Sequence, residues 1–433
     1  MKNPILKLAL PNIISNITVP LVGMVDLALM GHLDSEVYLN AIAIGGSIFS
    51  FIYLSFGFLR MGTTGFIAQA HGANDQQALV HIFSRALLVA FSIAFLLILA
   101  QYPIGILGIY ILHSSDQVNQ LAMGYFHIRI FAAPATLGLY AIYGWFIGRQ
   151  DAKTPLFLAL LVNIGNVIFN LIFIRVFHMK SEGVAWGTLV AQYLGFAWGL
   201  AIIFHKNREL WKTWAWERVI QANELKRFFS VNRDIFIRTL LLISTLTFFT
   251  AVSSRMGEKI LAVNTILFQF FFFFTYFIDG FANAAEALVG KYIGENKEYG
   301  LQILIFKIFS WGFGISLVFA LVYFVFGENL MRILTDIPEV IHEAKPYLIW
   351  IGVMPILSFA AFIWDGVYIG ATSAKAMRNA MIISSLLVYF PVYFLLQPWI
   401  GNHGLWIAFN AFLLSRGIIL QIYARKYIYA AKA

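Results

Sequence analysis

The stretch that decides the fold is Leu10–Leu33, LPNIISNITVPLVGMVDLALMGHL. A helix of about 20 apolar residues is long enough to cross a bilayer. This stretch also carries two prolines, Pro11 and Pro20, and one carboxylate, Asp26, with no basic residue close by in sequence. An acid at membrane depth is costly and usually functional, and a proline allows the helix to bend. The stretch therefore predicts a membrane helix that combines a titratable group with a hinge.

The composition of the whole chain is typical of a polytopic membrane protein. Of its 433 residues, 60% are hydrophobic and only 12% are charged, about half the charged fraction of a soluble domain. The net charge of +9 does not indicate nucleic-acid binding, because the basic residues sit mostly in certain loops, where they orient the spans. The chain has no cysteine, which excludes disulfides, thiolate catalysis and cysteine metal sites. The first apolar segment is too long for a signal peptide, so we expect it to remain as the first span.

Twelve apolar segments are long enough to span a membrane, which predicts an all-α polytopic protein. Several exceed the minimal length, so we expect tilted or bent helices. The most polar stretch, 206–233, predicts a cytoplasmic linker between an amino-terminal lobe, 1–205, and a carboxy-terminal lobe, 234–433. The approximate limits of the segments are 8–31, 39–69, 84–111, 121–147, 156–177, 183–205, 234–254, 260–289, 301–326, 339–370, 379–399 and 403–424.

The distribution of lysine and arginine predicts the orientation of these spans. The amino terminus carries Lys2 and Lys7, the linker is rich in basic residues, and the tail carries Arg425 and Lys426. The loop between the first two spans has acids but neither lysine nor arginine. We therefore expect a multi-pass protein of the cell membrane with both termini in the cytoplasm.

Two short motifs recur in corresponding places of the two halves. Residues 144–153, GWFIGRQDAK, resemble residues 366–375, GVYIGATSAK. Gly57-Phe58 followed by AHGAN at 70–74 resembles Gly280-Phe281 followed by IGEN at 293–296. With six spans in each half, the repeats share their topology. They predict two six-helix lobes related by a pseudo-two-fold axis along the membrane normal, with substrate bound between them.

Four acids fall inside the apolar spans and are the candidates for ion coupling: Asp26, Asp279, Glu286 and Asp365. Asp279 and Glu286 are seven residues apart and share one helix face. The alternative is structural pairing with a basic group, and for Asp365 the candidate partner is Arg416. The sequence contains no Walker A, GxGxxG or HExxH motif. We therefore expect no cofactor, and an ion gradient of H⁺ or Na⁺ as the energy source.

The fifth span is unusually rich in amides, with Asn163, Asn166 and Asn170. Asn166 and Asn170 are i, i+4 neighbours, so their side chains lie on one face. They could hydrogen-bond another helix, support a protonated Asp26 or hold an ion. The run Phe268–Phe277 cannot all face one side of a helix. Most of it is explained by packing and lipid contact, and part could line an aromatic cavity for organic cations.

Several short groups of residues carry a family resemblance. On these groups the chain resembles the multidrug and toxic compound extrusion (MATE) transporters, in particular the branch named for the DNA-damage-inducible F protein. The resemblance covers essentially the whole chain. The groups are Pro11, Val25-Asp26, Met30–Leu33, Asn166, Phe173-Ile174, Ala262–Asn264, Asp279–Phe281, Ala285–Ala287, Trp364–Gly366, Ile369–Thr372 and Met377–Asn379.

The resemblance implies a secondary active antiporter that exports amphipathic, often cationic compounds in exchange for H⁺ or Na⁺. It implies a cation site in the amino lobe at Asp26, Asn166, Asn170 and Thr188, and a bending proline at Pro11. The family has an acid where this chain has Asn170, so a bound Na⁺ would be neutralised by Asp26 alone. The acid that some members use in the seventh span has no clear counterpart here. Both departures favour protons over Na⁺ as the coupling ion.

These observations lead to one mechanism. Protonation of Asp26 would remove the cost of burying its charge, let the first span bend near Pro11 or Pro20, and expel the drug. The coupling works only if protonation favours one conformation over the other. Asp279, Glu286 and Asp365 are candidates for a second site in the carboxy lobe.

Three other classes of membrane protein are alternatives. A lipid or lipid-linked oligosaccharide flippase of the same superfamily is the nearest alternative, although the chain lacks a basic intramembrane cluster. A major-facilitator transporter would have a Gly-Asp-Arg-Gly loop after the second span, where this chain reads AQAHGANDQQ at 68–77. A membrane enzyme would need His or acids clustered at a membrane face. The expected partners are small organic cations and the lipid bilayer, with no nucleic acid, and an internal cavity suggests a monomer.

Overall fold

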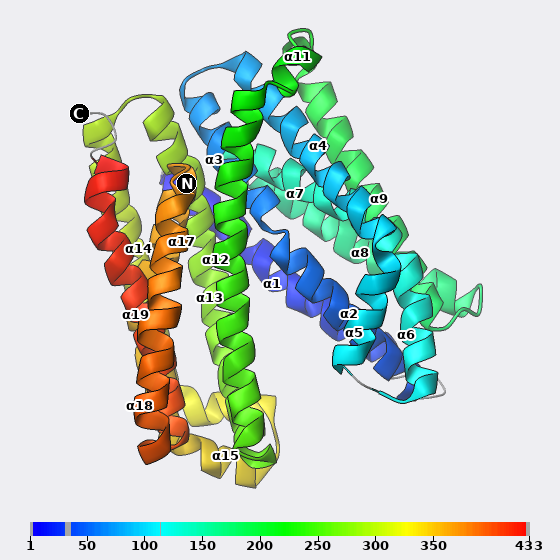
Figure 1. Cartoon of the computed structure of the whole chain (residues 1–433), viewed down its shortest axis with the longest axis vertical. Coiled ribbons are helices and arrows are strands. Elements are labelled where there is room, and N and C mark those ends of the chain that lie inside the picture. The colour runs from blue at the N-terminus through cyan, green and yellow to red at the C-terminus, as the bar shows by residue number, and fades with distance from the viewer. Residues whose placement is uncertain (1–2, 31–35, 113, 430–433) are drawn as a thin grey trace. The chain divides into compact units, whose positions relative to one another are not determined.

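The computed structural model describes residues 3–30, 36–112 and 114–429, and the side chains in these ranges apart from those of residues 19–30. Every regular element within them is helical, as predicted (Figure 1). Eleven of the described helical segments are long and apolar enough to cross a membrane, and α1 is a further helix of 27 residues. The helices are α1 (Pro4–Met30), α2 (Glu36–Ser55), α3 (Phe58–Gly72), α4 (Gln76–Leu99), α5 (Gln101–Leu112), α6 (Asp116–Arg129), η1 (Ile130–Ala132), α7 (Ala133–Gly148), α8 (Lys153–Arg175), α9 (Ser181–Lys206), α10 (Arg208–Trp211), α11 (Trp216–Val219), α12 (Ala222–Arg255), α13 (Glu258–Gly294), α14 (Glu298–Leu334), α15 (Pro338–Ala344), η2 (Lys345–Tyr347), α16 (Leu348–Gly370), α17 (Ala374–Ile382), η3 (Ile383–Tyr389), α18 (Phe390–Ile400), α19 (Asn402–Ala424) and η4 (Arg425–Tyr429).

Several predicted spans are interrupted in the structure. The second span is broken around Gly57 into α2 and α3. The third is broken at Ala100 into α4 and α5, and the fourth contains the short 3₁₀ turn η1 directly before α7. A proline in the first turn of α7 continues the chain as a new helix, because its missing N–H is tolerated there. The eleventh contains a π-helical stretch, η3.

The chain forms two compact units, residues 14–229 and residues 1–13 with 230–433. The amino-terminal boundary differs from the lobe 1–205 that the sequence suggested. The first turns of α1 bury Leu8, Ala9 and Ile13, and they pack on α13 at Gly280, where an added Cβ would lie 2.9 Å from the carbonyl oxygen of Ala9. The residues of the predicted linker, 206–233, also fall differently. The helices α10 and α11 and the start of α12 belong to the unit 14–229.

The internal repeat is visible in the backbone. Asn74, Gln150, Asn296 and Thr372 all have a positive φ, and each is the second residue after the end of a helix. At each of them the next residue donates its N–H to a carbonyl five positions earlier, for example Asp75 to Ala70, which satisfies the helix end. Asn296 follows Asn74 at the same interval at which Thr372 follows Gln150. The two halves therefore end corresponding helices in the same way.

The repeated glycines are points where two helices approach closely within each unit. In α7, an added Cβ on Gly148 would lie 2.8 Å from a carbonyl oxygen of α3. In α16, an added Cβ on Gly370 would lie 2.6 Å from the carbonyl oxygen of Glu286, and one on Gly366 would overlap the carbonyl of Ala282 in α13. Small residues four apart allow helix backbones to approach in this way. The motif found in the sequence is therefore a packing motif.

Candidate functional site

Three of the residues predicted for the amino-lobe site meet in a buried hydrogen-bonded chain. Asn170 Nδ2 donates to Asn166 Oδ1 over 3.1 Å, and Asn166 Nδ2 donates to Thr188 Oγ1 over 2.9 Å. These hydrogen bonds join α8 to α9, and all three side chains are at most 8% exposed. Thr188 in turn donates to the carbonyl oxygen of Val184 over 2.9 Å. The cluster offers neutral oxygen and N–H groups and no formal charge of its own.

A glycine makes this close approach possible. Gly187 lies beside Thr188 in α9, and an added Cβ there would be 2.8 Å from the backbone nitrogen of Asn170 and would overlap its side-chain oxygen. Asn166 and Asn170 are one helical turn apart on α8, so their side chains stack on the face toward α9. The sequence predicted the stacking, whereas the role of Gly187 depends on how the two helices cross.

Asp26 and Pro20 lie on α1 among the residues whose side chains are outside the described part of the structure. Their predicted roles therefore stay predictions. The α1 backbone is helical from Pro4 to Met30, through both prolines. At Pro11 the helix lacks one donor, and in the same turn Asn12 Nδ2 donates to the carbonyl oxygen of Leu8 over 2.8 Å. The boundary between the two units follows Ile13, directly after this turn.

In the carboxy-terminal unit, Asp365 is held by two arginines. Arg416 Nη2 in α19 donates to Asp365 Oδ2 over 2.7 Å, which is the pairing that the sequence left open. Arg238 in α12 donates to the same oxygen. Asp365 and Arg238 are each 7% exposed and Arg416 is 1% exposed. Sequence reasoning missed Arg238, although a lone arginine inside the predicted span 234–254 was a signal for it.

This arrangement limits what Asp365 can do. Two guanidinium groups already share one carboxylate oxygen, so an additional cation there would have to displace a tethered one. Asp279 on α13 is half-buried. Glu286, two turns further along α13, is 2% exposed. The described residues therefore place Asp365 in an ion-pair network, whereas the roles of Asp279 and Glu286 remain predictions.

Another buried acid, Asp234, lies on α12 one turn before Arg238. Asp234 is 4% exposed and accepts hydrogen bonds from Arg378 Nη1 over 2.8 Å and from Arg233 Nη2 over 3.3 Å. Asp234 and Arg238 are i, i+4 neighbours, so alternating charges follow one side of α12. Among the described residues, no three His, Asp or Glu side chains come together in a way that could hold a metal ion.

An uncharged network in the same unit was also missed. Asn264 Nδ2 donates to Ser253 Oγ over 2.7 Å and to Asn402 Oδ1 over 2.8 Å, while Trp406 Nε1 donates to Asn264 Oδ1 over 2.9 Å. The network ties α12, α13 and α19 together. Because its polar atoms partner one another, its chemistry is that of a packed core.

The comparisons with known proteins agree with this architecture. A family model described as MatE matches residues 11–172 and 235–395. The DNA damage-inducible protein F of Escherichia coli (strain K12) is 38% identical over 97% of this chain and 91% of its own length. The probable multidrug resistance protein NorM of Thermotoga maritima is 23% identical over 98% of this chain and 92% of its own length. A solved outward-facing multidrug resistance MATE family transporter of the MOP superfamily superposes with a TM-score of 0.87 at 18% identity, covering 99% of this chain and 96% of that one.

Proposed function

The chain belongs to the MatE family of membrane transporters, and on that premise we propose that it exports amphipathic, often cationic organic compounds in exchange for protons. The family is one of transporters rather than enzymes. The T. maritima relative is named as a probable multidrug resistance protein, which supports the substrate class.

The neutral hydrogen-bonded series Asn170–Asn166–Thr188 is the observation that carries the choice of protons. At the position of Asn170 an acid would add a second negative charge, and the amide adds none. A proton on Asp26 would make the whole group neutral, and a neutral acid can donate to an amide or hydroxyl oxygen. A bound Na⁺ would need its charge balanced by Asp26 alone in a region that excludes water, which is less favourable.

The proposed switch is a bend of α1 near Pro11. Residues 4–13 of α1 belong to one unit and residues 14–30 to the other, so a change at this turn acts on a helix that both units share. Pro11 lacks the N–H that would hold the preceding turn, which lowers the cost of bending. Pro20 would serve as a second bending point. Protonation of Asp26 would drive the change only if it stabilises one of the two conformations more than the other.

The carboxy-terminal acids have a secondary place in this proposal. Asp365 forms ion pairs with Arg238 and Arg416, so we assign it a structural role rather than a role in proton coupling. Asp279 and Glu286 are the remaining candidates in that unit, and they would take over the coupling if the amino-terminal site did not carry it.

Transport in proteoliposomes tests the proposal. A pH gradient and, separately, a Na⁺ gradient are imposed, and uptake of a fluorescent organic cation is followed for the wild type, Asp26→Asn and the control Asp336→Asn, which removes an exposed acid. We expect transport driven by pH, abolished in Asp26→Asn and unchanged in Asp336→Asn. Transport driven only by Na⁺ would overturn the choice of ion. Proton-driven transport that survives Asp26→Asn and is lost in Asp279→Asn would move the coupling to the carboxy-terminal unit.

A further inference from the structure

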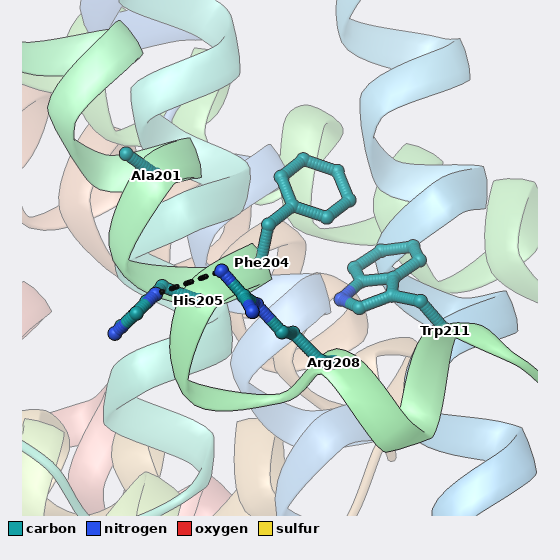
Figure 2. A pocket seen from close by; sticks show the side chains of 5 residues that line it. All are labelled: Ala201, Phe204, His205, Arg208 and Trp211. Atoms are coloured by element: carbon teal, nitrogen blue, oxygen red, sulfur yellow. Dashed lines mark hydrogen bonds between the residues drawn. The ribbon is translucent and has the colours of Figure 1, made fainter.

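An open groove lies where α9 ends and α10 begins (Figure 2). It has a volume of about 390 Å³ and is lined by Ala201, Phe204, His205, Arg208 and Trp211. Figure 2 shows the Arg208 guanidinium and the His205 ring turned toward each other on one side and the rings of Phe204 and Trp211 on the other. The groove therefore has a polar, basic side and an aromatic side.

The basic side carries little compensating negative charge. Arg208 Nη2 is 3.4 Å from His205 Nδ1, which is long for a hydrogen bond, and both side chains are exposed. The nearest acid in sequence, Glu209, is engaged by Lys212 Nζ over 2.6 Å. Close by, Arg149 Nη1 donates to Asn207 Oδ1 over 2.5 Å, which adds a further positive charge. Burial lowers the pKa of Arg149, but an arginine remains cationic at any physiological pH.

The length of α9 places the groove at the depth of the lipid headgroups if the helix is centred in the bilayer and perpendicular to it. α9 has 26 residues, so its last turn is roughly 17–19 Å from its midpoint at 1.5 Å per residue. The hydrocarbon core ends about 15 Å from the bilayer centre and the headgroup layer extends to about 20–22 Å. A helix centred in the bilayer therefore brings His205 and Arg208 to the phosphate layer.

Aromatic residues around the groove fit the same environment. The rings of Phe204 and Trp211 are 4.5 Å apart, and Phe204 is 44% exposed. Trp214 and Trp216 follow directly, 45% and 50% exposed, and Trp214 Nε1 donates to Ser84 Oγ of α4 over 3.2 Å. Tryptophan concentrates at the membrane interface because its ring is apolar and its N–H is polar. The segment is thus basic, aromatic and fixed against the helices that it follows.

From these observations we propose that the groove binds the phosphate of an anionic phospholipid. Arg208 presents the planar set of N–H donors that fits a phosphate, His205 supplies a second donor, and Phe204 with Trp211 packs against the apolar part of the lipid. This site is separate from the transport site and does not depend on the transported compound or the coupling ion. It makes the segment that follows α9 responsive to the composition of the surrounding lipid.

Native mass spectrometry of the full chain in neutral detergent tests this site, with phosphatidylglycerol as the probe and phosphatidylcholine as the zwitterionic reference. The test variant is Arg208→Gln. The matched control is Lys226→Gln, which removes one exposed positive charge at the start of α12, outside the residues that line the groove. We expect Arg208→Gln to weaken phosphatidylglycerol binding about tenfold or more, the effect of losing a charged hydrogen bond, and Lys226→Gln to change it less than twofold. Arg208→Lys keeps the charge and should fall between them, because it loses the planar fork.

Three results would overturn the proposal. Equal losses in Arg208→Gln and Lys226→Gln would indicate general surface charge rather than a site. Equal affinity of the wild type for phosphatidylcholine would show that the lipid's negative charge is not recognised. Full displacement of phosphatidylglycerol by millimolar inorganic phosphate would identify free phosphate as the ligand. Because Arg208 is exposed, its variants should remain folded, and thermal unfolding of each variant checks this.

Discussion

Asn170 is the residue on which the proposed choice of coupling ion depends. It is fully buried and is tied to Thr188 through Asn166. Asn170→Asp keeps the shape but adds a carboxylate, so we expect the variant to gain a Na⁺ site. Because a bound ligand stabilises the folded state, by about 2.7 kcal/mol at 100 times its Kd, Na⁺ should raise the Tm of this variant and leave the wild-type Tm unchanged relative to K⁺. Asn163→Asp, on the same helix outside the polar chain, is the control; an equal Na⁺ response in that variant would contradict the prediction.

Asp365 matters for stability because it is the carboxylate between two buried guanidinium groups. Asp365→Asn leaves both positive charges in a region that excludes water, and we expect it to lower the free energy of unfolding by about 3–5 kcal/mol. Glu209→Gln breaks an exposed pair with Lys212 and should cost at most about 1 kcal/mol. Denaturant unfolding in detergent compares the two variants. Similar small losses would mean that the two arginines find other partners when the acid is removed.

The crossing of α13 and α16 leaves little room for a larger side chain. An added Cβ on Gly366 would overlap the backbone carbonyl of Ala282, which cannot rotate away, whereas Gly314 in α14 has no neighbouring atom within 4 Å of such a Cβ. Gly366→Ala should therefore push the helices apart and lower the Tm. Gly314→Ala should raise stability by about 0.5–1 kcal/mol, because alanine loses less backbone entropy in a helix. Thermal unfolding of both variants tests this prediction. A change of Tm in the same direction in both would indicate a general effect of alanine instead.

Arg85 of α4 is the buried side chain that holds the segment after α9 on this helix, alongside the exposed hydrogen bonds of Trp214 and Arg218. Arg85 is 6% exposed, and its guanidinium donates to the carbonyl oxygens of Val219 over 3.0 Å and of Arg218 over 2.6 Å. Arg85→Met removes these donors, so we expect chymotrypsin to cleave near Trp214 and Trp216 about tenfold faster, as for loss of roughly 1.4 kcal/mol of local stability. Arg218→Met, which removes an exposed hydrogen bond to Gln77, is the control. Unchanged cleavage in Arg85→Met would show that packing alone holds the segment.

At the scale of the whole molecule, the apolar segments and the repeat could be predicted from the sequence, because both depend on local patterns. The pairing of Asp365 with Arg416 could be named as a candidate, since few charges lie in the spans. Arg238 could not be assigned to the same carboxylate, because the partner of a buried charge depends on how three helices are rotated and crossed. The packing of residues 1–13 on α13 was missed for the same reason: it depends on Gly280 leaving room for Ala9 and Ile13, and periodicity carries no information about that distance.

The orientation of the chain is also a whole-molecule property, and its lack of cysteine makes the test direct. The basic loops predict that the segment after α9 faces the cytoplasm and that the turn between α5 and α6 faces outward. Lys212 is exposed, with 69% of its side chain accessible, and Ser115 is exposed in that turn. In intact cells, a membrane-impermeant maleimide should label Ser115→Cys and spare Lys212→Cys, and permeabilisation should allow both to react. Labelling of Lys212→Cys before permeabilisation, with Ser115→Cys protected, would invert the topology and place the basic, tryptophan-rich groove at the outer leaflet.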